Sequence, residues 1–170
     1  VSILCETGEV SKPKSIVNAE TTIGIDLGIK NFIVCSNNKI FNNPTFLRKN
    51  KNKLQYLQKK YSKHKSKRVK QKLSILHEKI TNQRKDFLHK ISSKLINNHD
   101  TICVENLAIS NMLKNHNLAQ AISDAGWGIF VNMLEYKAEW YGKNIIKIGR
   151  FDPSSKTCSN CGFVNKELSL

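Results

Sequence analysis

Two carboxylates in this chain each stand at the end of a short apolar segment. Asp26 follows Ile23-Gly24-Ile25, and Glu105 closes the segment 101–104, Thr-Ile-Cys-Val. Apolar, β-branched segments of this kind favour strands, so both carboxylates are predicted at the ends of strands. Mg²⁺ binds oxygen ligands in proteins, usually one or two carboxylates together with waters and substrate phosphates. Asp26 and Glu105 are therefore candidate ligands of a catalytic Mg²⁺.

Asp26 and Glu105 also have simpler interpretations. Acidic residues at strand ends are often solvated, and their spacing alone favours that alternative. Residues 24–28, Gly-Ile-Asp-Leu-Gly, are also typical of the phosphate-binding first strand of actin-like ATPases. The sequence shows no second Gly-rich phosphate loop, which disfavours the ATPase interpretation.

Cys158 and Cys161 have the spacing of a zinc knuckle, and Gly162 permits a tight turn after the second thiolate. Structural Zn²⁺ normally takes four ligands from two such pairs, so the single pair predicts half of a zinc site. A redox dithiol is the alternative, but such a pair normally opens a helix in a thioredoxin-like unit. No such unit surrounds this pair.

Basic residues are concentrated between the two carboxylates. The chain has 170 residues with 28 Lys and Arg against 13 Asp and Glu, a formal net charge of +15. This balance indicates a nucleic-acid partner first and an anionic membrane surface second. A solvated helix face usually mixes signs, whereas unbalanced cations favour contact with phosphates. The predicted nucleic-acid-binding residues are Arg48, Lys49, Lys59, Lys60, Lys63, Lys65, Lys67, Arg68 and Lys70.

Other features of the sequence indicate a cytoplasmic protein without a membrane segment. No apolar segment is long enough to cross a bilayer, and the first residues do not have the pattern of a signal peptide. Cys5, Cys35 and Cys103 stand singly in apolar segments, which is typical of buried thiols in a reducing compartment.

The pattern of apolar residues predicts the elements that position these groups. Residues 47–96 have helical periodicity with a break at 62–67, which predicts two helices packed as an antiparallel pair. A further helix is predicted over 127–141, with Ser123 and Asp124 as candidate N-caps. Strands are predicted at 23–26, 32–35, 39–41, 101–105 and 144–148. Strands and helices in this order predict a mixed α/β sheet with covering helices.

Six segments of the chain together resemble a known family. They are residues 24–32, 79–89, 104–107, 122–128, 133–142 and 153–162. In these segments the chain is similar to the TnpB/OrfB proteins of insertion sequences, which are RNA-guided DNA endonucleases related to the type V CRISPR nucleases. The resemblance implies a RuvC-like domain of RNase H fold, with a basic helical hairpin and a partial zinc ribbon.

The resemblance also assigns roles to the residues. It implies that Asp26 and Glu105 are the first and second catalytic carboxylates and bind Mg²⁺. Cys158 and Cys161 would be the first half of the Zn²⁺ ligand set. The implied partners are DNA and a guide RNA from the transposon end, and the implied location is the cytoplasm, in association with the nucleoid.

The resemblance implies three regions. Residues 1–20 would end a wedge-type domain, residues 21–150 would form the RuvC-like core with the hairpin at 47–96, and residues 151–170 would be the first half of a zinc ribbon. The family's second Cys pair and third catalytic Asp are not in this sequence. The chain is therefore expected to be a fragment that does not cleave DNA on its own, and the alternative is a non-cleaving nucleic-acid-binding remnant of the family.

Overall fold

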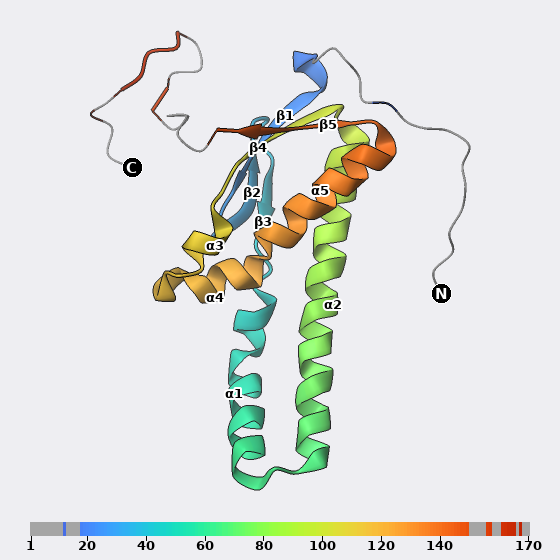
Figure 1. Cartoon of the computed structure of the whole chain (residues 1–170), viewed down its shortest axis with the longest axis vertical. Coiled ribbons are helices and arrows are strands. Elements are labelled where there is room, and N and C mark those ends of the chain that lie inside the picture. Colours follow the sequence, from blue (N-terminus) through green and yellow to red (C-terminus); the bar gives the residue numbers. More distant parts are fainter. Residues whose placement is uncertain (1–11, 13–17, 150–155, 158–160, 166, 168–170) are drawn as a thin grey trace.

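A five-stranded mixed sheet organises the chain in the computed structural model (Figure 1). The structure describes residues 18–149, together with Lys12, Lys156, Thr157, residues 161–165 and Glu167. The strand order is β3-β2-β1-β4-β5; β1 pairs parallel with β4 and β4 with β5, while β1 with β2 and β2 with β3 are antiparallel. This arrangement confirms the predicted mixed α/β fold. The strands are β1 Thr22–Leu27, β2 Asn31–Cys35, β3 Ile40–Asn42, β4 Thr101–Glu105 and β5 Asn144–Ile148.

Helices cover one face of this sheet. Residues of β1 alternate between the two faces, and Ile23, Ile25 and Leu27 point into the core. Phe130 and Leu134 of α5 and Leu88 of α2 are fully buried in the same cluster. The opposite face of β1 carries Asp26, which is exposed. The helices are η1 Ala19–Thr21, α1 Phe46–His64, α2 Lys67–Asn98, α3 Ile109–Met112, α4 His116–Ala125 and α5 Trp127–Tyr141.

Helices α1 and α2 form a pair that extends away from the sheet (Figure 1). α1 ends at His64 and α2 begins at Lys67, inside the break predicted at 62–67. A second apolar cluster, separate from the main core, joins the two helices. It contains Leu54, Leu57, Val69, Leu76 and Ile80. The periodicity of the sequence predicted this pair because each helix has one apolar stripe and buries it against the other.

One predicted cap was wrong. Ser123 and Asp124 lie inside α4 and do not cap α5, whose N-cap is Gly126 with φ of 72°. The sequence analysis did not predict α4, because it is short and is followed directly by the helical pattern of α5. Gly126 separates the two helices, and its positive φ is one that favours glycine.

Lys137 of α5 is a buried lysine without a carboxylate partner in the described residues. It is 6% exposed, and its Nζ donates to Ser92 Oγ at 2.7 Å, Ser93 Oγ at 2.8 Å and the His89 carbonyl at 3.1 Å. Burial lowers the pKa of Lys137 below its ordinary value of 10.5. The ammonium group therefore joins α5 to α2 through neutral oxygens.

The lowered pKa of Lys137 predicts a pH dependence of stability. Between the folded-state pKa and 10.5, the unfolded chain binds the proton more tightly, so the free energy of unfolding rises with pH in this window. The difference in free energy of unfolding between the wild type and Lys137→Met is expected to shift in favour of the wild type between pH 7 and pH 10.5, the ordinary pKa of lysine. Urea titrations at both pH values measure this difference, and a difference independent of pH would contradict the prediction.

Candidate functional site

The structure brings Asp26 and Glu105 together. The parallel pairing of β1 with β4 places Gly24 beside Cys103 and Ile25 beside Val104, so the next residues in this register are Asp26 and Glu105. Neighbouring residues in register on adjacent strands point to the same face of a sheet. Both carboxylates are exposed, and both line one open hollow of about 380 Å³. The structure therefore places the two acids on adjacent strands and on one face of the sheet.

Apolar side chains flank the two carboxylates in a row across the sheet. Val34 of β2 pairs with Asp26, and Ile148 of β5 pairs with Glu105. Ile40 of β3 continues the row beside Val34 and is 53% exposed. The pair of charges therefore lies on the face of the sheet opposite α2 and α5, where a ligand can reach it.

The Asp26 and Glu105 carboxylates have no cationic partner among the described residues. Two neighbouring carboxylates repel each other unless a cation or proton lies between them, so this pair suits a divalent cation. No third His, Cys, Asp or Glu joins them in a metal-binding group within the described part of the chain. Two carboxylates fit Mg²⁺, which takes its remaining ligands from water and phosphate oxygens.

Gly28 shapes the turn that follows Asp26. A Cβ atom at Gly28 would lie 2.7 Å from the Asn31 carbonyl oxygen, too close for any other residue without a shift of the backbone. The Gly28 N–H donates to the Phe32 carbonyl at 3.2 Å, which closes the turn between β1 and β2. In the structure, this glycine permits the close approach of the chain to itself in the β1–β2 turn.

Cys161, one residue of the predicted zinc half-site, is exposed and free, and Cys158 lies outside the described residues. Thr157 and Val164 form an antiparallel bridge on either side of this pair. Gly162 has φ of 72°, as expected for a tight turn after the second cysteine. Binding of Zn²⁺ by Cys158 and Cys161 stays a prediction.

All nine predicted nucleic-acid-binding residues are exposed on α1, on the first turns of α2 or at Lys65 between them. Among the described residues, the ion pairs are Arg84 with Asp124, Lys90 with Asp86, Lys143 with Asp100 and Lys147 with Glu135. None of these pairs involves the nine residues. Their positive charge is therefore not compensated by acidic side chains of the described chain.

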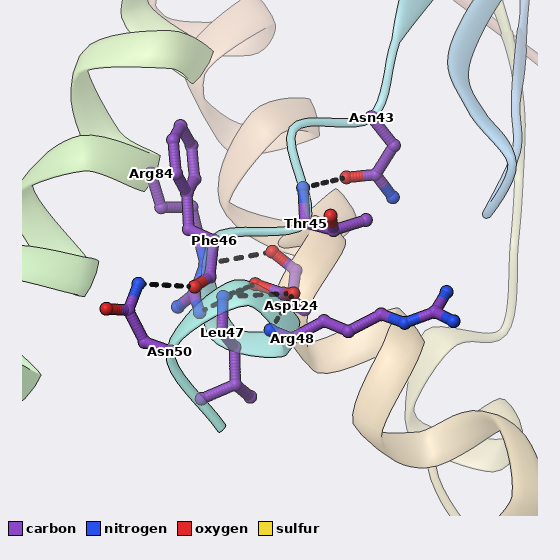
Figure 2. Close-up of polar contacts among 8 residues, drawn as sticks. All are labelled: Asn43, Thr45, Phe46, Leu47, Arg48, Asn50, Arg84 and Asp124. Atoms are coloured by element: carbon purple, nitrogen blue, oxygen red, sulfur yellow. Dashed lines mark hydrogen bonds and ion pairs between the residues drawn. The ribbon is translucent and has the colours of Figure 1, made fainter. Parts of the chain in front are cut away.

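The buried carboxylate of Asp124 fixes the start of α1 (Figure 2). The sequence pattern had predicted this residue as a cap of a different helix. Asp124, on α4, is 6% exposed; its carboxylate accepts from the N–H of Leu47 at 2.9 and 3.1 Å and from the N–H of Arg48 at 3.2 Å. Arg84 of α2 donates from Nε to the Asp124 carbonyl at 2.9 Å, and its Nη2 lies 3.5 Å from Oδ1. Thr45, the N-cap of α1, makes no side-chain cap of its own. Asp124 therefore supplies this cap and joins α1, α2 and α4.

The fold and the site define a class of mixed α/β proteins in which an exposed pair of carboxylates on neighbouring strands accompanies a basic helical extension. A family model for OrfB proteins of the IS605 type, described as "Probable transposase", matches residues 3–116. A second model, described as the TNB domain of Cas12f1-like proteins, matches residues 127–169. The chain belongs to the TnpB/OrfB family of insertion sequences.

Similar curated proteins carry related names. A candidate RNA-guided DNA endonuclease of Streptomyces pristinaespiralis is 38% identical over the whole of this chain, and the candidate endonuclease InsQ of Escherichia coli is 30% identical. A TnpB-like protein of Acanthamoeba polyphaga mimivirus is 28% identical over 88% of the chain. The chain spans 42% of the length of the Streptomyces protein and 46% of that of InsQ.

Two solved structures share the fold. A Cas12f1–sgRNA–target DNA complex matches 89% of this chain and 41% of the Cas12f1 chain, with a TM-score of 0.58 and 22% identity. A CRISPR-Cas12f ternary complex matches 95% of this chain and 34% of the Cas12f chain, with a TM-score of 0.63 and 24% identity.

Within the described residues, no helix is long and apolar enough to cross a membrane.

Proposed function

We propose that this chain forms the nuclease core of a transposon-associated RNA-guided DNA endonuclease, with a RuvC-like sheet of the RNase H type. The observation that carries the proposal is the position of Asp26 and Glu105, side by side on the face of the sheet opposite α2 and α5 and without cationic partners in the described residues. Membership of the TnpB/OrfB family supports it.

Asp26 and Glu105 would hold Mg²⁺ in this function. When bound, the metal supplies the positive charge that activates water and stabilises the leaving oxygen in phosphodiester hydrolysis. The two side chains fix the place of this chemistry on the sheet, because each stands at the end of a strand anchored in the core. Val34 and Ile148, which flank them in the row, limit the approach of a substrate to the hollow between.

The basic helices would hold nucleic acid through its phosphates. The nine exposed cations lie on or between α1 and α2, beyond the end of the sheet (Figure 1). The names of the relatives and the complexes in which Cas12f occurs support DNA and RNA as partners. A guide RNA derived from the transposon end, Zn²⁺ held in part by Cys158 and Cys161, and a cytoplasmic location associated with the nucleoid belong to the same proposal.

One observation favours a second function, that of a non-cleaving nucleic-acid-binding protein. Phosphodiester hydrolysis with two metals normally needs a bridging carboxylate besides Asp26 and Glu105. In the part of the chain that the structure describes, no third acidic residue joins the pair. A protein of this kind would bind nucleic acid through α1 and α2 without turnover.

Guide-dependent cleavage distinguishes the two functions. This chain can be grafted in place of the matching part of the Streptomyces relative, to which it is 38% identical. The nuclease proposal expects Mg²⁺-dependent cleavage of a target strand by the chimera when its guide RNA is present. A chimera that binds guide and target without cleaving would support the binding protein instead.

The basic surface of α1 makes a separate prediction. Replacement of Lys59, Lys60 and Lys63 by glutamine is expected to weaken binding to structured RNA or duplex DNA. The slope of log affinity against log salt should become shallower by roughly 0.7 to 0.9 for each phosphate that the variant no longer neutralises. Fluorescence anisotropy at several salt concentrations measures the slope.

A matched control removes the same charge from paired lysines. Lys90, Lys143 and Lys147 each contact a carboxylate, so their replacement by glutamine should change the slope less. Equal slopes for the two triple variants would show that α1 has no specific role in binding.

A further inference from the structure

A second hollow, the α1–α4 cavity, lies beyond the end of β1. It shares no lining residue with the hollow of Asp26 and Glu105. The β1–β2 turn, the first turns of α1 with the residues before them, and one side of α4 line it, and its volume is about 640 Å³. This volume is in the range of sites that hold a small molecule or a nucleotide, and it is too small for a nucleic-acid duplex.

Three cations surround the α1–α4 cavity. Lys30 comes from the β1–β2 turn, and Arg48 and Lys51 come from α1. All three are exposed, and none has an acidic partner among the described residues. A cavity with this charge suits an anion, and most strongly one that accepts several charge-assisted hydrogen bonds.

The acidic residue that lines the cavity does not neutralise these cations. The Asp124 carboxylate is already bonded to the N–H groups of Leu47 and Arg48 and lies 3.5 Å from Arg84 Nη2. Figure 2 shows that the Arg48 side chain extends away from this carboxylate. The Arg48 guanidinium group is therefore available to a ligand while the Arg48 backbone is held by Asp124.

Hydrogen bonds fix the walls of the cavity in place. The Asn43 side chain donates to the Ile29 carbonyl at 2.8 Å and accepts from the Thr45 N–H at 3.1 Å, so it joins the β1–β2 turn to the start of α1. Asp124 joins α1 to α4 in the same region. A site whose walls are fixed before binding loses less conformational entropy when the ligand arrives.

We propose that the α1–α4 cavity binds one nucleotide of a single-stranded nucleic acid, with its phosphate held by Lys30, Arg48 and Lys51. The exposed side chains of Asn117 and Gln120 on α4 offer hydrogen bonds to the base or sugar. The choice of nucleic acid among anions rests on the proposed function. Ile29 and Lys30, which line the cavity, follow β1 directly, and Asp26 lies near the end of the same strand. Both sites therefore lie at the same end of β1.

A probe too short to reach the rest of the basic surface tests the proposal. The full chain is titrated with a 5′-phosphorylated dinucleotide, as DNA and as RNA, in buffer without divalent cations, and amide shifts are followed by NMR. Saturable shifts are expected at Lys30, Arg48, Lys51 and Gln120. Replacement of Lys30, Arg48 and Lys51 by glutamine should weaken binding at least about tenfold, the effect of losing one charge-assisted hydrogen bond. The relative affinities of the DNA and RNA forms identify the strand.

Two further variants distinguish binding in the cavity from non-specific attraction by the positive charge of the chain. The triple variant with Lys90, Lys143 and Lys147 replaced by glutamine carries the same charge change and should bind the dinucleotide within about twofold of wild type, because these residues do not line the cavity. Ala121→Trp fills the cavity without a change of charge and should abolish the shifts.

Equal weakening in both triple variants, absence of saturable shifts, or equally tight binding of an acidic dipeptide would overturn the proposal. Asp26 and Glu105 are unchanged in every variant and no metal is added. A negative result here therefore leaves the nuclease proposal standing, and loss of cleavage in the chimera leaves the cavity proposal standing.

Discussion

Replacement of Asp124 by alanine is expected to lower the free energy of unfolding by about 2–4 kcal/mol. The carboxylate is nearly buried and satisfies the N–H groups of Leu47 and Arg48 at the start of α1. Without it, these donors lose their cap, and the Arg84 guanidinium loses its acidic partner in a half-buried site. Loss of a cap and loss of a buried ionic partner both destabilise, and here they occur together.

A surface aspartate provides the control for this prediction. Asp86 contacts Lys90 at 2.7 Å, but both side chains are mostly exposed, at 61% and 73%. Asp86→Ala should therefore change the free energy of unfolding by no more than about 0.5 kcal/mol. Urea denaturation followed by circular dichroism compares the two variants, and an equal effect of both would show that Asp124 contributes no more than a surface ion pair.

Local patterns in the sequence were sufficient to predict the sheet and the longer helices. The strands β4 and β5 and the helix α5 have the residue ranges that were predicted for them. Each of these segments carries a clear apolar pattern and faces a single core, so the periodicity of the sequence matches the side that is buried. The apolar stripes of α1 and α2 predicted their mutual packing for the same reason.

The role of Asp124 could not be predicted in the same way. Leu47 is 77 residues away in the sequence, and the hydrogen bond between them depends on how α4 packs against the start of α1. A capping residue is recognisable from sequence when it precedes the helix that it caps. Asp124 does precede α5, and this local pattern led to the wrong helix. The α1–α4 cavity was missed because it is assembled from three separate segments of the chain.

The site of the two carboxylates, Asp26 and Glu105, could be predicted from the sequence only in part. The apolar segments that end at Asp26 and Glu105 predicted two strands, but not their neighbourhood, which depends on the parallel pairing of β1 with β4. Resemblance to a family placed the two residues in one site on the strength of sequence motifs. The structure adds their common face, the shared hollow and the apolar flanks Val34 and Ile148.

In the chimera with the Streptomyces relative, Asp26→Asn and Glu105→Gln are each expected to reduce Mg²⁺-dependent cleavage by about a thousandfold or more. The reason is that metal-activated hydrolysis loses most of its charge stabilisation when one of the metal's ligands is lost. Each substitution keeps the shape of the side chain and removes one of the two negative charges that would hold the metal. Affinity for the target strand should stay within about threefold of wild type, because the cations that we propose to bind phosphates lie elsewhere.

Two measurements make this prediction specific to Asp26 and Glu105. In the ungrafted chain, paramagnetic broadening by Mn²⁺ should appear at both residues and disappear in either variant, since one carboxylate alone holds such an ion weakly. Asp86→Asn, which removes an equal charge from the exposed surface of α2, should leave both cleavage and broadening unchanged. Cleavage that persists in Asp26→Asn, or broadening centred on another acidic residue, would show that the chemistry of this protein does not take place at the ends of β1 and β4.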